Sequence, residues 1–176
     1  MGNSMKHLIS SVVFCCTLVP FGHQPAACEL GSLHRLTIDP ISPDRRDIFA
    51  GQGKTVRVEF HNYSDSDPVE VFPEPPLTVR RPATNTSCEI DGGVWPRDSV
   101  FLSDDEKILV VAEFSGSSAH LLAYDTGTCK IQGNIDISNA RLSVSGKEIT
   151  LATRCSDNDM KSCKSRRVVP ASKLCS

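Results

Sequence analysis

Along most of the chain, hydrophobic and polar positions follow the short period of β-strands rather than the longer period of a helix. Residues 55–61 alternate strictly, because Val56, Val58 and Phe60 are separated by charged or polar side chains. A period of two places one face of a strand against a core and the other face in water. We therefore predict a strand here with one buried and one exposed face.

Further short apolar runs, separated by turn residues, continue toward the C-terminus. They cover residues 33–38, 100–102, 108–114, 119–124, 131–137, 142–144 and 149–152. The segments between them are rich in Asp, Ser and Gly, which favour turns. Strands with turns every ~8–12 residues are typical of a sandwich, a barrel or a propeller-like sheet.

Residues 100–137 show the order of strands and turns of one propeller blade. The chain is too short for the several blades that a propeller needs. The predicted fold is therefore all-β: a single antiparallel-sheet domain with propeller-blade-like strands, stabilised by disulfides.

The first 27 residues have the features of a secretory signal peptide. Lys6 lies in a short polar lead, the apolar run 8–21 follows, and small residues precede Cys28. The run is shorter than the ~20 residues of a membrane span and contains Ser, Thr and Pro. We predict cleavage near Ala26 or Ala27, which leaves residues 28–176 as an exported, soluble domain.

A buried N-terminal strand and lipidation at Cys28 are the alternatives to this signal. Pro25 stands where a lipoprotein signal has a branched apolar residue. Lipidation would also leave an odd number of thiols in an oxidising compartment.

Composition indicates a folded protein and excludes two classes. The chain has 176 residues, of which 39% are hydrophobic and 23% charged, and its formal net charge is −2. It is too apolar for a disordered tail and too balanced in charge for a nucleic-acid-binding protein. A chain of this length usually forms one domain.

Eight cysteines are a high number for this length. Signal cleavage removes two of them and leaves six: Cys28, Cys88, Cys129, Cys155, Cys163 and Cys175. The sequence has no Cys-x-x-Cys pair and no zinc-finger spacing, so we predict no metal site. Six cysteines in an exported chain form up to three disulfides, with fifteen possible pairings. Cys155 and Cys163 flank a polar loop that a local bridge would close.

The sequence lacks the familiar catalytic motifs. Residues 115–119 lack the glycine pair of a nucleophile elbow, and residues 51–54 precede a strand rather than the helix of a phosphate-binding loop. Neighbouring carboxylates at 104–105 and 157–159 lie in polar turns. We predict a binding protein without a cofactor and not an enzyme. A hydrolase with an unfamiliar site, and an exported β-domain that binds a small molecule or glycan, are the alternatives.

Two kinds of segment are candidates for recognising a partner. The turn 114–118 contains small residues that can enter a cleft, although a plain hairpin loop has the same composition. Phe72 and Trp95 lie beside prolines or glycines. They are either exposed anchors of an interface or side chains packed under a long loop.

Several strings of residues, in this order, resemble one family. They are FPEPP (72–76), CEIDGGVW (88–95), VFLS (100–103), EFSGSSA (113–119), YDTGTCK (124–130) and DIS (136–138). They are similar to the periplasmic immunity proteins of type VI secretion that neutralise the first family of peptidoglycan amidase effectors. The similarity runs from Cys28 to Cys175 and includes all six mature cysteines.

The resemblance implies a periplasmic inhibitor, a monomer that binds a papain-like amidase one to one. The residues that match the family's inserted turn and its base are Ser115, Gly116, Ser117, Ser118, Glu113 and Phe114. Ser117 would place its hydroxyl against the catalytic Cys-His pair of the amidase. Flanking contacts would come from residues 64–76 and 91–95, since a stable interface buries ~1,600 Å². The chain departs from the family at His120 and in loop 62–71, which leaves the preferred effector open.

Overall fold

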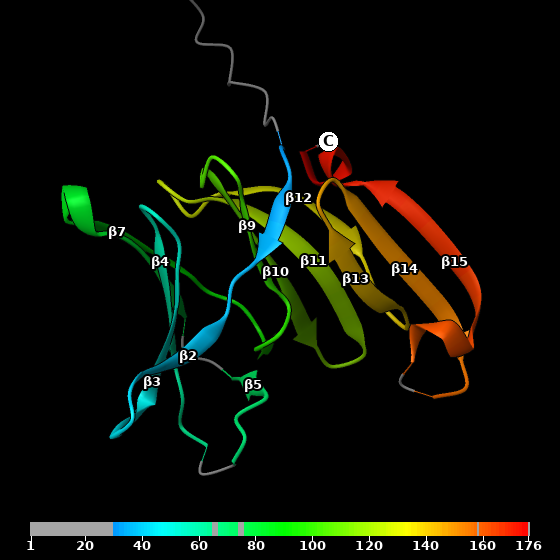
Figure 1. Ribbon diagram of the computed structural model, residues 1–176, viewed down its shortest axis with the longest axis horizontal. Helices are drawn as coiled ribbons and strands as arrows, with labels where there is room; N and C mark the ends of the chain where they lie inside the picture. Colours follow the sequence, from blue (N-terminus) through cyan, green and yellow to red (C-terminus); the bar gives the residue numbers. More distant parts are fainter. Residues whose placement is uncertain (1–29, 65–66, 74–75, 158, 176) are drawn as a thin grey trace, which may run out of the picture.

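Antiparallel strands in four sheets build the described part of the protein, whose computed structural model is drawn in Figure 1. The structure describes residues 30–64, 67–73, 76–157 and 159–175. The predicted all-β class with antiparallel pairing is confirmed, and the strands divide among four sheets instead of forming the single sheet expected. Short 3₁₀ helices complete the fold: η1 (Pro82–Thr84), η2 (Met160–Ser162) and η3 (Ala171–Cys175).

Two of the sheets have five strands each. The central sheet has the order β1 (Leu33–Arg35), β9 (Val100–Ser103), β10 (Ile108–Ser115), β11 (Ser118–Asp125), β12 (Ile131–Asp136). The N-terminal sheet has the order β2 (Ile38–Ser42), β3 (Arg45–Gln52), β4 (Arg57–His61), β6 (Leu77–Arg81), β7 (Thr86–Ile90).

The other two sheets are smaller. The C-terminal sheet consists of β13 (Arg141–Ser145), β14 (Glu148–Cys155) and β15 (Cys163–Pro170). A two-stranded sheet pairs β5 (Val71–Phe72) with β8 (Trp95–Pro96).

The middle of the central sheet is buried on both faces, which explains why the run in β10 is almost continuously apolar. Leu109 and Val111 belong to a core shared with the N-terminal sheet. Val110 and Ala112 belong to a second core shared with the C-terminal sheet and η3. The alternation expected of a strand with one wet face is therefore lost, because side chains on both faces are apolar.

The predicted strand at 55–61 is confirmed as β4 and its approach. Val56, Val58 and Phe60 are buried in the first core, whereas Arg57 and His61 are only partly buried. The charged face of this strand carries an ion pair from Arg80 of β6 to Glu59, with 2.5 Å between Nε and Oε2. The outward face is thus stabilised by charge pairing and the inward face by apolar contacts.

Two disulfides join described cysteines. Cys88 of β7 is bonded to Cys129 after β11, so this bridge ties the N-terminal sheet to the central sheet. Cys155 is bonded to Cys163 across the β14–β15 connection, which confirms the predicted local bridge. Cys175 lies in η3 and is disulfide-bonded. Cys28 lies outside the described residues.

The buried carboxylate of Glu106 connects the same two sheets. Glu106 lies in the β9–β10 turn and accepts hydrogen bonds from the backbone N–H groups of Lys54, Thr55 and Val56 in the β3–β4 turn. The hydroxyl of Thr55 also donates to it, at 2.6 Å. Burial by itself would raise the pKa of Glu106, but the hydrogen bond from Thr55 and those from the backbone outweigh burial and lower it. The turns of two sheets are therefore held together by a charge-assisted cluster.

The predicted signal peptide at 1–27 lies outside the described residues. Among the helices of the described ranges, none is long and apolar enough to cross a membrane.

Candidate functional site

The turn between β10 and β11 is a two-residue hairpin loop, found below the labels of these two strands in Figure 1. The strands pair from Ile108 and Asp125 through to Ser115 and Ser118. Gly116 occupies the first position of the loop with a φ of +59°, and Ser117 the second. Glycine at the first central position with positive φ is the pattern of a type II′ hairpin turn. Residues 115–118 are all exposed, so the turn presents three serine hydroxyls and one glycine to solvent.

The segment 91–95 lies directly beside the base of this hairpin. Val94 and Phe114 exchange backbone hydrogen bonds of 2.9 Å in both directions. A Cβ on Gly93 would lie only 2.3 Å from the carbonyl oxygen of Phe114, so this close approach requires glycine. Two of the segments singled out from the sequence are thus brought together.

Glu113 of β10 lies beside the same segment, on the face of the central sheet that packs against the N-terminal sheet. Its carboxylate lies so close to Gly92 that a Cβ there would come within 2.5 Å of Oε2. Burial, together with the charge of Glu113 and a hydrogen bond to it, raises the pKa of Tyr124 to about 12. Glu113 therefore lies between the hairpin base, Tyr124 of β11 and the Gly-Gly segment.

The other strand of the hairpin is held by the loop that follows β12. The backbone N–H of Ala119 donates to the Ser138 hydroxyl at 3.0 Å, and the N–H of Ile137 donates to the Ala119 carbonyl at 2.9 Å. Ser138 in turn donates its backbone N–H to Asp136 at 2.8 Å, a contact that lowers the pKa of Asp136. Both strands of the hairpin thus have backbone support as far as the Phe114–Ala119 pair, one pair before the tip.

Phe72 and Trp95 are not exposed anchors, so that part of the sequence interpretation is wrong and the alternative of packing under a loop is correct. They pair across the two-stranded sheet, and their exposed fractions are only 1% and 0%. Phe72 stacks on Phe60 with 4.7 Å between ring centroids. The pairing brings residues 71–72 of the Pro-rich loop to the 91–95 segment, and there Val71 is 46% exposed.

His120, one of the two departures from the family pattern, lies in the row of side chains at the hairpin base. It pairs with Glu113 on one side and with Asp136 on the other. Its Nδ1 atom is buried without a hydrogen-bond partner among the described residues. The departure therefore falls beside the turn rather than at its tip.

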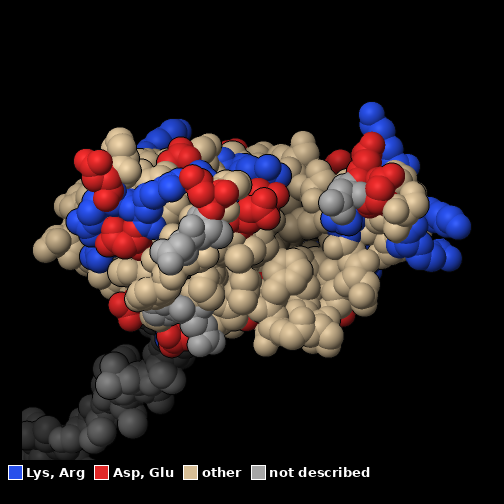
Figure 2. All heavy atoms as spheres, turned by 90° about the horizontal axis from the view of Figure 1, so that it is seen from below, with Lys and Arg blue, Asp and Glu red and all other residues tan. Residues whose placement is uncertain are grey.

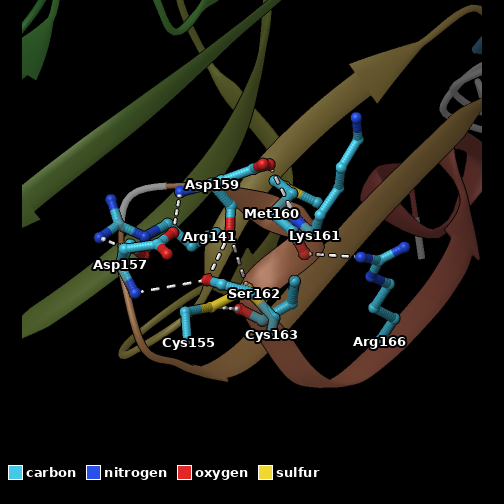
Figure 3. Close-up of a disulfide and its surroundings, with 10 residues drawn as sticks. Arg141, Cys155, Asp157, Asp159, Met160, Lys161, Ser162, Cys163 and Arg166 are labelled. Atoms are coloured by element: carbon cyan, nitrogen blue, oxygen red, sulfur yellow. Dashed lines mark hydrogen bonds between the residues drawn. A yellow bond between two sulfur atoms is a disulfide. The ribbon is translucent and has the colours of Figure 1, made fainter.

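A crevice on the opposite side of the hairpin base was not predicted from the sequence. This crevice has a volume of about 490 Å³ and is lined by Phe114, Ile137, Asn139, Ala140, Arg141, Arg154 and Cys155. Cys155, which lines the crevice, is bonded to Cys163, and Figure 3 shows Arg141 beside the loop that this disulfide closes. The lining residues come from three separate parts of the chain, so no local pattern could have revealed the crevice.

Figure 2 views the molecule from the lower side of Figure 1. Lys and Arg side chains gather at one edge of this face, and a mostly uncharged surface separates them from a region of mixed charge.

Within the described ranges, no group of three His, Cys, Asp or Glu side chains is placed to hold a metal ion.

Comparison of this chain with known proteins shows its family. The family model described as "Immune protein Tsi1" matches residues 32–175. The chain belongs to the Tsi1 immune protein family. It is 40% identical over 119 residues to the immune protein Tsi1 of Pseudomonas aeruginosa, an alignment that covers 66% of this chain and 69% of that protein. The family inferred from the sequence is thereby confirmed.

Proposed function

We propose that this Tsi1-family protein binds a papain-like peptidoglycan amidase delivered by type VI secretion and blocks its active site with the Ser115–Ser118 turn. The observation that carries this proposal is an exposed two-residue hairpin loop whose strands are supported on both sides. The membership of an immune protein family supports a protective role for it.

The narrow tip suits a cleft that normally admits a peptide stem. Gly116 has no side chain, and nothing lies within 4 Å of the position its Cβ would take. The hydroxyl of Ser117 can exchange hydrogen bonds with the thiolate and imidazole of the amidase's Cys-His pair. Gly116 and Ser117 lie beyond the last strand pair, Ser115 with Ser118, so their backbone groups are not used in the β10–β11 ladder. Polar groups of the turn would thus fill the substrate cleft of the amidase, and the turn contains no bond that the amidase cleaves.

The support of the hairpin favours tight binding. Ordering a loop upon association costs free energy, and a loop that is already ordered avoids most of that cost. Val94 holds the β10 side, and Ser138 and Ile137 hold the β11 side. The protein acts as a stoichiometric inhibitor in the periplasm, one monomer for each amidase, and carries out no reaction itself.

Enzyme titration with a matched pair of variants tests this proposal. The oxidised mature chain is titrated against a type VI peptidoglycan amidase of the papain-like class, with purified peptidoglycan as the substrate. Ser117→Arg places a bulky side chain at the tip, while Ser172→Arg adds the same side chain at an exposed position of η3. We expect stoichiometric inhibition by the wild type and by Ser172→Arg, and none by Ser117→Arg. Equal inhibition by both variants would reject the inserted turn.

A further inference from the structure

The crevice beside the hairpin is the open end of the second core. Val110 and Ala112 of β10 point into that core, and Phe114, two residues further along, points to the same side. Phe114 is 41% exposed there, whereas Val110 and Ala112 are buried. Ile137, which is buried in the same core, forms the neighbouring part of the floor.

The short length of the hairpin sets the distance between the crevice and an amidase that holds the tip of the turn. Beyond Phe114 only Ser115 and the tip of the turn project, a distance of ~7 Å at the rise of an extended strand. A cleft that receives Ser117 at its catalytic centre therefore has its rim at the level of Phe114. On one side the rim meets the segment 91–94, and on the other side it faces the crevice.

The chemistry of the crevice combines an apolar floor with a cationic edge. Phe114, Ile137 and Ala140 supply the floor, and Arg154 stands at the edge. Arg154 is exposed, and its side chain makes no hydrogen bond or ion pair within the described part of the chain. By contrast, the neighbouring Arg141 donates to the carbonyl of Asp157, a contact drawn in Figure 3.

The backbone at Arg154 is held in an unusual conformation. Its φ is +56°, and it drops out of the strand pairing between the Thr153–Ser165 pair and the Cys155–Cys163 pair. A left-handed backbone is unfavourable for a residue with a side chain, and such residues concentrate at functional sites. The adjacent disulfide fixes the position of this residue at the rim of the crevice.

We propose that the crevice receives a segment from the rim of the amidase's cleft, with an apolar side chain on Phe114 and a carboxylate paired with Arg154. This inference rests on the proposed function and adds a second, reciprocal contact: the hairpin enters the amidase, and a rim segment of the amidase enters the crevice. Pairing an otherwise unpartnered cation with a carboxylate at the edge of an interface gives specificity as well as affinity.

The test measures the dissociation constant of the complex for wild type, Arg154→Gln, Arg154→Glu and Lys147→Glu. Lys147 is exposed and lies in the β13–β14 turn, at the other end of the C-terminal sheet. Lys147→Glu replaces a cation by a carboxylate just as Arg154→Glu does, so it is a control for net charge. We expect about tenfold weaker binding for Arg154→Gln and about a hundredfold for Arg154→Glu, with Lys147→Glu within about twofold of wild type. The affinity of Arg154→Gln should also depend less on salt than that of the wild type. Circular dichroism and thermal melts show whether each variant is folded.

Three outcomes overturn the inference. If Arg154→Glu binds within about twofold of wild type while Ser117→Arg abolishes inhibition, the hairpin model stands and the crevice contact is wrong. If Lys147→Glu weakens binding as much as Arg154→Glu, the effect is one of net charge and no local carboxylate is present. If the wild type binds no amidase, the proposed function and this inference both fail.

Discussion

Val94 and Phe114 form an isolated antiparallel bridge, with each residue donating its backbone N–H to the carbonyl of the other at 2.9 Å. This bridge connects the Gly-Gly-Val-Trp segment with the base of the exposed hairpin. Together with the pairing of residues 71–72 to residues 95–96, it places the segments 71–72, 91–95 and 113–118 side by side. The shape of the proposed inhibitory turn thus depends on residues about twenty positions earlier in the chain.

The first prediction concerns the close approach at Gly93. A methyl group there would meet the backbone carbonyl of Phe114, so Gly93→Ala has to push the two segments apart. Overpacking of this kind costs about 1–3 kcal/mol, and we expect a loss of that size together with weaker amidase inhibition. Gly31→Ala is the matched control, because nothing lies within 4 Å of its Cβ position. Chemical denaturation and inhibition assays of both variants check this, and equal behaviour of the two would contradict it.

The second prediction concerns the cluster around Glu106. Replacing Glu106 with Gln removes the charge that accepts hydrogen bonds from Thr55 and two neighbouring backbone N–H groups. Hydrogen bonds to a charged group contribute about 1.5–3 kcal/mol, so we expect Glu106→Gln to lower the free energy of unfolding by about 2–3 kcal/mol. Glu89→Gln, at an exposed position of β7, should change it little. Urea denaturation of the two variants at neutral pH measures the difference.

The third prediction is a dependence of stability on pH. The pKa of Glu106 in the folded protein is below its ordinary value of 4.5. A carboxylate of this kind stabilises the fold above its unfolded-state pKa, and the contribution is lost as the pH falls through the lower folded-state value. The unfolding free energy of the wild type should therefore fall more steeply between about pH 5 and pH 3 than that of Glu106→Gln. Parallel curves for the two proteins would show that another carboxylate causes the loss.

The fourth prediction ranks the two described disulfides. Cys88–Cys129 spans 41 positions and Cys155–Cys163 spans 8. Because the stabilisation by a bridge grows with the length of the loop it closes, we expect a loss of about 4 kcal/mol when serines replace the first pair and about 2.5 kcal/mol for the second. Thermal unfolding of the two double variants gives the ranking, and the reverse order would show that the loop-length effect does not dominate here.

Local patterns were sufficient for the features that depend on neighbouring residues. The alternation at 55–61 predicted β4 because a strand buried on one face has a period of two. The polar loop between Cys155 and Cys163 predicted a local bridge, and the small residues at 115–118 predicted a hairpin turn. In each case the interacting residues are close in sequence, so the pattern contains the information.

Features that depend on distant contacts could not be predicted in the same way. Phe72 and Trp95 are buried because their strands pair with each other over the aromatic core of the N-terminal sheet, which a Pro- and Gly-rich context does not reveal. The division into four sheets depends on which face each strand presents to which neighbour. Arg154 reaches the hairpin only through the packing of the C-terminal sheet against the central sheet.

The most direct test of the proposed active-site block is the reactivity of the amidase's catalytic cysteine. Its rate of alkylation by iodoacetamide is measured with the amidase alone, with one equivalent of the oxidised wild-type chain, and with one equivalent of Ser117→Arg. Cys88, Cys129, Cys155 and Cys163 of the inhibitor are held in disulfides and do not compete for the reagent. We expect near-complete protection by the wild type and none by Ser117→Arg. A stable complex with the wild type in which the cysteine is alkylated at the free rate would contradict the block by the hairpin.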